Sequence, residues 1–157
     1  MLRFDVHALG EAGVYLPDES ATLELGARLA RTLRPDLIVY LRGELGAGKT
    51  TVIRGLLRAL GWQGPVRSPT YALVEVYAIS RLDLHHFDFY RFHDPREWID
   101  AGFRESFNGR TVSLIEWPER AGGLLPPADV EIALALHGDG RSATLTSHSP
   151  AGAKCLA

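Results

Sequence analysis

A glycine-rich segment that runs into lysine and threonine has the residue types and spacing that bind phosphate groups. Residues 42–51 read RGELGAGKTT. The fixed positions of the pattern G-x-x-x-x-G-K-[ST] are occupied by Gly43, Gly48, Lys49 and Thr50. Two glycines, a lysine and a hydroxyl residue at set positions rarely coincide by chance in so short a chain. The segment therefore predicts a nucleotide-binding loop rather than an ordinary glycine-rich turn.

Each residue type in this loop has its own task in binding a triphosphate. Backbone N–H groups of a tight concave loop can point at the anion together, and glycines allow the positive φ angles and close approach that this requires. Lys49 would reach the β- and γ-phosphates as a point charge, while the Thr50 hydroxyl is placed to ligate magnesium. The helix that begins here would turn its positive end toward the phosphates. The predicted nucleotide contacts are Glu44, Leu45, Gly46, Ala47, Gly48, Lys49, Thr50 and Thr51.

The segments around the loop have the strand–loop–helix order that the motif requires. Residues 36–41 form an apolar run typical of a buried strand. After the loop, apolar residues from Val52 to Leu60 recur at helical spacing, and Gly61 stands where a helix C′ residue belongs.

The rest of the chain predicts a single α/β domain with a mixed β-sheet. Asp18 is expected to cap a helix that Pro35 ends. Two strands over 71–78 and 82–90 have so short a link that they must form an antiparallel hairpin after the phosphate-loop helix. The other expected elements are a strand at 13–16, a helix beginning at Asp94 and breaking at Gly102, a turn at 103–107, a strand at 111–117, and a hairpin with strands at 130–136 and 141–146.

We expect the phosphate-loop domain to span residues 14–147, with an N-terminal extension over 1–13 and a disordered tail over 148–157. Hydrophobic content of 46% and charged content of 23% in 157 residues are ordinary for one globular domain. A net charge of −2 argues against a broad basic surface for nucleic acid. We expect neither membrane nor DNA as a partner. The only cysteine, Cys155, excludes an internal disulfide, and the cytoplasm is the expected compartment.

Two carboxylates are candidates to complete a magnesium site. Asp88 and Glu116 each lie near the end of an apolar strand, at the edge of the sheet where α/β folds bind ligands. Either could instead be a solvated strand-end acid. In the irregular loop after the helix, Thr70 and Ser68 could sense the γ-phosphate or simply form a connecting turn. His86 could support the metal site or be an ordinary core histidine.

Several ordered motifs together resemble the TsaE (YjeE) family, the bacterial ATPases needed to make threonylcarbamoyladenosine in tRNA. Besides the phosphate loop, the resemblance rests on Ser68-Pro69-Thr70-Tyr71, on His86-Phe87-Asp88-Phe89-Tyr90-Arg91 and on Ile115-Glu116-Trp117-Pro118-Glu119. It implies an α/β phosphate-loop fold, ATP or ADP binding, magnesium on Thr50 and Glu116, and a functional role for Asp88. Looser likeness implies nucleotide contacts from Glu19 and Arg141.

The resemblance also implies two partner proteins, TsaB and TsaD, with tRNA contacted indirectly through that complex. Catalytic roles would then belong to Lys49, Thr70, Asp88 and Glu116. Because no arginine is evidently placed as a finger, we expect slow hydrolysis by the isolated chain. A small-molecule kinase of the phosphate-loop class is the alternative enzyme, although no lid segment is evident. A nucleotide-dependent scaffold without hydrolysis also remains open, whereas a GTPase is disfavoured because the N-K-x-D and D-x-x-G motifs are missing.

Overall fold

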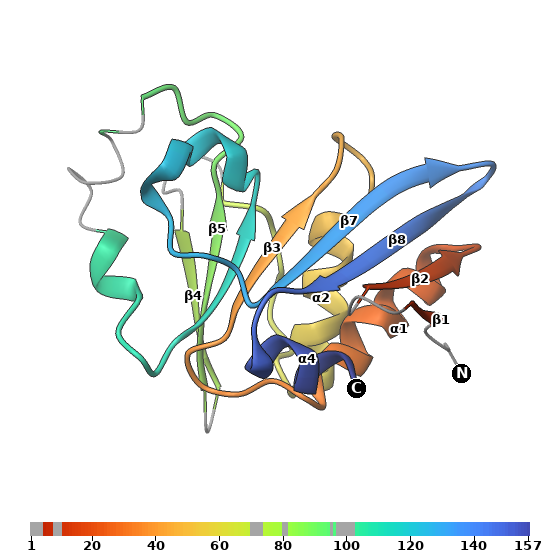
Figure 1. The fold of residues 1–157 in the computed structure, drawn as a ribbon, viewed down its shortest axis with the longest axis horizontal. Helices are drawn as coiled ribbons and strands as arrows, with labels where there is room; N and C mark the ends of the chain where they lie inside the picture. The colour runs from red at the N-terminus through yellow and green to blue at the C-terminus, as the bar shows by residue number, and fades with distance from the viewer. Residues whose placement is uncertain (1–4, 8–10, 70–73, 80–81, 95, 97–102) are drawn as a thin grey trace.

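One mixed β-sheet organises the molecule in the computed structural model, which describes residues 5–7, 11–69, 74–79, 82–94, 96 and 103–157. Eight strands of these residues follow the order β1-β2-β8-β7-β3-β6-β5-β4 (Figure 1). Their bounds are β1 Asp5–His7, β2 Glu11–Leu16, β3 Ile38–Arg42, β4 Val74–Ile79, β5 Leu82–Asp88, β6 Val112–Glu116, β7 Val130–His137 and β8 Gly140–Ser147. The central pairs β3–β6, β3–β7 and β5–β6 are parallel, and the outer pairs are antiparallel. The predicted α/β fold with a mixed sheet is confirmed.

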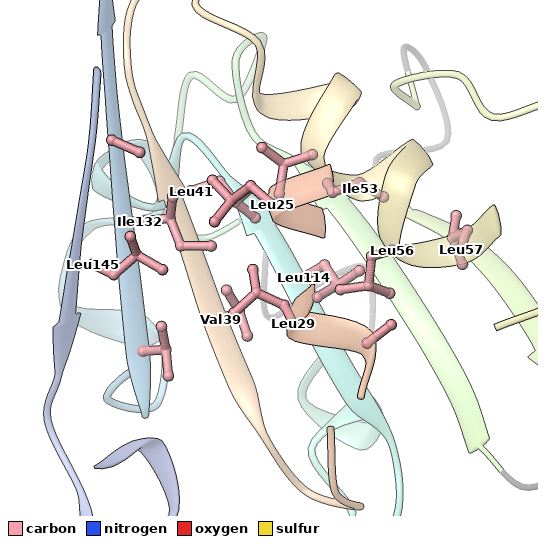
Figure 2. Packing of buried hydrophobic residues seen from close by; sticks show 14 of the residues in the cluster. Leu25, Leu29, Val39, Leu41, Ile53, Leu56, Leu57, Leu114, Ile132 and Leu145 are labelled. Atoms are coloured by element: carbon pink, nitrogen blue, oxygen red, sulfur yellow. The ribbon is translucent and has the colours of Figure 1, made fainter. Parts of the chain in front are cut away.

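Helices α1 (Glu19–Ala30) and α2 (Lys49–Ala59) cover one face of this sheet. Figure 2 shows Leu25 and Leu29 of α1 and Leu56 of α2 directed toward strand residues such as Val39 and Leu114. Burying this continuous apolar layer supplies the main stabilisation of the domain, at about 25 cal/mol per Å² removed from water.

The opposite face of the sheet carries an aromatic layer. Phe87 and Ile115 from the central strands pack there with Phe89 and Phe92 from the segment after β5. The short 3-10 helix η2 (Pro118–Leu124) contributes Ala121 to the same cluster. The two layers fix the positions of β5 and β6 from both sides, and with them the residues at their ends.

Most expected elements are present. Asp18 caps α1 through a 2.8 Å hydrogen bond from Ala21 N–H, and Gly61 has the positive φ of a C′ residue. The hairpin after α2 is antiparallel, with Val74 opposite Phe87. The second turn appears as the 3-10 helix η1 (Phe103–Ser106). The helix predicted from Asp94 and the link at 79–81 fall largely outside the described residues.

Both ends of the chain differ from expectation. Strand β2 begins at Glu11 and pairs with β1, so residues from the expected 1–13 extension belong to the sheet. The tail expected to be disordered over 148–157 forms helix α4 (Pro150–Leu156). Ser149 is the N-cap of this helix and Pro150 begins its first turn, both of which are helix-start signals. The small, polar residues of the segment had instead favoured disorder. Cys155 belongs to this helix and is buried, with its Sγ 3.2 Å from the Thr32 hydroxyl.

No helix in the described part of the chain is both long and apolar enough to cross a lipid bilayer.

Candidate nucleotide and magnesium site

The phosphate loop, residues 43–50, joins the end of β3 to the start of α2. Gly43, Gly46 and Gly48 have φ angles of 146°, 79° and 108°, a region that L-residues with side chains rarely adopt. A Cβ at Gly43 would lie 2.5 Å from the Leu134 carbonyl oxygen. The first glycine is therefore required by the neighbouring strand β7 as well as by the curvature of the loop.

Lys49 lies inside this loop with 5% of its surface exposed. Its Nζ donates to the carbonyl oxygens of Gly43 and, at 3.0 Å, Glu44, and it stands 4.6 Å from the centre of the Trp117 ring. Burial lowers the pKa of this amine, while nearby acids, Glu116 foremost, act to raise it. The positive charge of Lys49 therefore lies at the loop, and the nearby Glu116 carboxylate partly balances it.

The two candidate carboxylates meet at the ends of neighbouring parallel strands. Asp88 of β5 is the register partner of Glu116 of β6. Thr50 Oγ1, at the first turn of α2, donates to Glu116 Oε2 at 3.0 Å. The residues that sequence reasoning assigned to magnesium are therefore brought together from three separate elements.

Ser68 links the two acids. Its hydroxyl hydrogen-bonds Asp88 Oδ2 and lies 3.5 Å from Glu116 Oε2. Burial raises the pKa of Asp88, against the lowering effect of the hydrogen bonds from Ser68 and from Tyr90 N–H. The irregular loop is thus more than a connecting turn at this residue, whereas Thr70 lies outside the described residues.

Two adjoining hollows flank the phosphate loop. One of about 250 Å³ holds the predicted catalytic groups and is lined by Leu45, Gly46, Gly48, Lys49, Thr50, Thr51, Ser68, Asp88, Tyr90, Glu116 and Trp117. A second of about 200 Å³ lies toward α1 and the β7–β8 turn, lined by Leu16, Asp18, Glu19, Thr22, Gly46, Gly48, Thr51, Asp139, Gly140 and Arg141. They share Gly46, Gly48 and Thr51, so a phosphate chain crossing the loop amides could have its nucleoside end in the second.

Glu19 and Arg141 both line this second hollow. An Arg141 side-chain nitrogen donates to the Gly46 carbonyl at 3.1 Å, and Glu19 pairs with Arg54 at 3.4 Å. Sequence reasoning missed Asp139 and Gly140, because Gly138-Asp139-Gly140 is recognisable only as a hairpin turn. The charged and turn residues together would be available to a polar sugar or base.

The donors present fit a magnesium ion. The described residues hold no group of three or more His, Cys, Asp or Glu side chains that could bind a metal by themselves. Magnesium bound with a nucleotide needs only one or two carboxylates, because phosphate oxygens and water complete its octahedron. Thr50, Glu116 and Asp88 offer the hard oxygen ligands that it prefers.

Comparison with known proteins identifies the family. Residues 16–143 match the model for TsaE, threonylcarbamoyl adenosine biosynthesis protein. The tRNA threonylcarbamoyladenosine biosynthesis protein TsaE of Haemophilus influenzae is 43% identical over 143 residues, 88% of this chain and 90% of that relative, and the TsaE of Treponema pallidum is 40% identical over 119 residues, 76% of this chain and 87% of that relative. The crystal structure of Bacillus subtilis YdiB matches with a TM-score of 0.76 at 27% identity, covering 92% of this chain and 90% of that one. With this agreement along nearly the whole sheet and phosphate loop, the chain belongs to the TsaE family of proteins that act in tRNA threonylcarbamoyladenosine biosynthesis.

Proposed function

We propose that this protein is a magnesium-dependent ATPase that supports tRNA threonylcarbamoyladenosine modification in the cytoplasm together with TsaB and TsaD. Membership of the TsaE family implies a phosphate-loop ATPase. The observation that carries the proposal is the convergence of Lys49, Thr50, Asp88 and Glu116 on one hollow at the parallel strand ends. In α/β folds this is the edge at which ligands bind.

The chain's own groups divide the work as follows. The loop amides and Lys49 hold the phosphates and offset the charge that develops on the transferring group. Thr50 and Glu116 would hold magnesium, which when bound supplies further positive charge to the β- and γ-phosphates. Asp88, whose pKa is raised by burial, would orient the attacking water, with Ser68 and the Tyr90 amide fixing its carboxylate. Thr70 remains a predicted γ-phosphate contact.

ATP is the proposed nucleotide, with the nucleoside in the second hollow beside Glu19 and Arg141. Among the described residues, no arginine lines the hollow that contains the catalytic groups. An arginine finger can contribute about 10³–10⁵ in rate to phosphate-loop hydrolysis. We therefore expect the isolated chain to turn over slowly and the complex with TsaB and TsaD to turn over faster, with tRNA bound through that complex.

Steady-state phosphate release, measured with and without TsaB–TsaD, tests this proposal. Rapid hydrolysis by the chain alone, or none in the full complex, would contradict it, as would transfer of phosphate to a metabolite. Lys49→Ala should abolish binding of a fluorescent ATP analogue. The matched control is Lys154→Ala, since Lys154 is the other lysine of the chain and is exposed on α4.

A further inference from the structure

A buried histidine stands behind the proposed magnesium ligand. His86 lies on β5 with none of its side chain exposed, two residues before Asp88. Its Nε2 lies 2.6 Å from Glu116 Oε2. Among the described residues that hydrogen-bond this carboxylate, His86 makes the shortest contact. The Nδ1 atom is buried and has no hydrogen-bond partner among the residues that the structure describes. A carboxylate oxygen only accepts hydrogen bonds, so Nε2 is the donor in the pair with Glu116.

Among the described residues, the hydrogen bonds to the Glu116 carboxylate are all on one oxygen. Oε2 accepts from Thr50 Oγ1 at 3.0 Å and faces Ser68 Oγ at 3.5 Å, in addition to His86. In the described part of the chain, no side-chain hydrogen bond reaches Oε1. Oε1 is thus the oxygen that the carboxylate can offer to a cation or to its bound water.

The three donors are not equivalent. Thr50 would also ligate magnesium through the same oxygen. Ser68 lies in an irregular loop, and its hydroxyl also hydrogen-bonds Asp88. His86 alone of the three lies within a β-strand: β5 pairs with β6 on one side and with β4 on the other, and the aromatic layer covers the opposite face of the sheet. It is the donor whose position does not depend on the ligand.

We propose that His86 is a positioning residue, which fixes the Glu116 carboxylate through Oε2 so that Oε1 is presented to nucleotide-bound magnesium. This inference rests on the proposed function, because it assigns a partner to one of its metal ligands. A group that orients a metal ligand typically contributes about 10- to 100-fold in metal affinity. His86 does not itself touch the nucleotide or the metal.

Two amide variants separate positioning from simple core packing. The glutamine side chain in His86→Gln can place its N–H donor near the position of Nε2, whereas that of His86→Asn reaches only the position of Nδ1. Both bury the same polar group, so both carry a similar penalty in stability, which thermal melting records. Magnesium is titrated into protein bearing a fluorescent ATP analogue, and analogue affinity is measured separately in EDTA.

We expect His86→Asn to raise the magnesium midpoint at least tenfold, and His86→Gln to stay within about threefold of the unmodified protein. Analogue affinity in EDTA should be the same for all three. In a Glu116→Gln background, both histidine substitutions should have no further effect on the magnesium midpoint, because His86 acts through that carboxylate.

Equal magnesium midpoints for the asparagine variant and the unmodified protein would overturn the inference. So would an equal loss of analogue affinity with magnesium and in EDTA, which indicates a structural role alone. If the asparagine variant fails to fold, the glutamine variant decides: a magnesium midpoint within about threefold of that of the unmodified protein supports the inference, and a larger rise overturns it. If the unmodified protein binds nucleotide with the same affinity with and without magnesium, the proposed function itself is refuted. That result can be told apart from the outcomes that concern His86.

Discussion

Helices α1 and α2 cross at two glycines, and alanine at either should destabilise the fold. A Cβ at Gly26 of α1 would lie 2.0 Å from the Val52 carbonyl oxygen, and one at Gly55 of α2 would lie 2.1 Å from the Leu23 carbonyl oxygen. Ordinary van der Waals contact begins at 3.4 Å. Because the obstacles are backbone atoms of a neighbouring helix, no side-chain rotation can remove the clash, and the two helices must move apart.

Two effects of opposite sign set the magnitude for Gly26→Ala. Alanine is favoured over glycine within a helix by about 1 kcal/mol. Overpacking a well-filled core costs typically about 1–3 kcal/mol, and contact with rigid backbone belongs at the upper end of that range. We therefore expect a net loss of about 2 kcal/mol in the free energy of unfolding, or about 4–8 °C in Tm for a domain of this size. Propensity alone predicts a gain.

Urea denaturation monitored by circular dichroism measures this change. Gly13→Ala is the matched control, since nothing lies within 4 Å of a Cβ at Gly13 and its φ is not positive. Gly26→Ala combined with Gly55→Ala should lose less than the two single losses added, because both open the same crossing. Gly26→Ala as stable as the unmodified protein would refute the reasoning. Since α2 carries the phosphate loop at its N-terminus, nucleotide affinity should fall along with stability.

Three further substitutions or treatments test other parts of the structure. Burial raises the pKa of the Cys155 thiol above its ordinary 9.0, so the thiol ionises first in the unfolded chain. The free energy of unfolding should therefore fall as pH rises above 9.0. Denaturation measured at several pH values should show this loss in the unmodified protein and not in Cys155→Ser. Gly48→Ala forces a side chain into φ 108°, which should reduce stability by about 1–3 kcal/mol and lower the affinity for an ATP analogue more than tenfold. The control is Gly123→Ala, at an open position without positive φ, which should change neither stability nor affinity. Asp129→Ala removes the acceptor of the buried Ile38 N–H, 2.8 Å away, and should cost about 1–3 kcal/mol in calorimetry; Asp129→Asn, which keeps an acceptor oxygen, should cost less.

Local chemistry made the phosphate loop and its flanking elements predictable from sequence. Glycines with positive φ, an apolar strand before them and helical spacing after them are properties of adjacent residues, so nothing distant had to be known. The hairpin of β4 and β5 followed in the same way, from a link too short for a crossover. The ends of strands could be located, and with them Asp88 and Glu116.

Long-range register decided what the sequence could not show. The pairing of Asp88 with Glu116 depends on how β5 aligns with β6, and the contact from Ser68 depends on how the preceding loop returns to the sheet. The tail was misjudged for a related reason. Helix α4 is held by Ser149, whose hydroxyl contacts Asp129 at 2.6 Å, a partner twenty residues away. A short segment of small residues has little local preference, so its structure comes from what it docks against.

Two features that local rules disfavour lie beside the phosphate loop. Trp117 has the left-handed angles φ 56° and ψ 49°, costly for a bulky residue, and its ring is the one that faces Lys49 Nζ. Asp88, at the end of the next strand, is held in surroundings that raise its pKa, so its ionisation subtracts stability from the fold as pH rises above the ordinary value of 3.8. The Trp117 ring also packs against the aromatic layer, so one side chain serves both the core and the hollow. Backbone strain and a carboxyl group with a raised pKa at the same hollow are typical of a binding site rather than of a purely structural strand end.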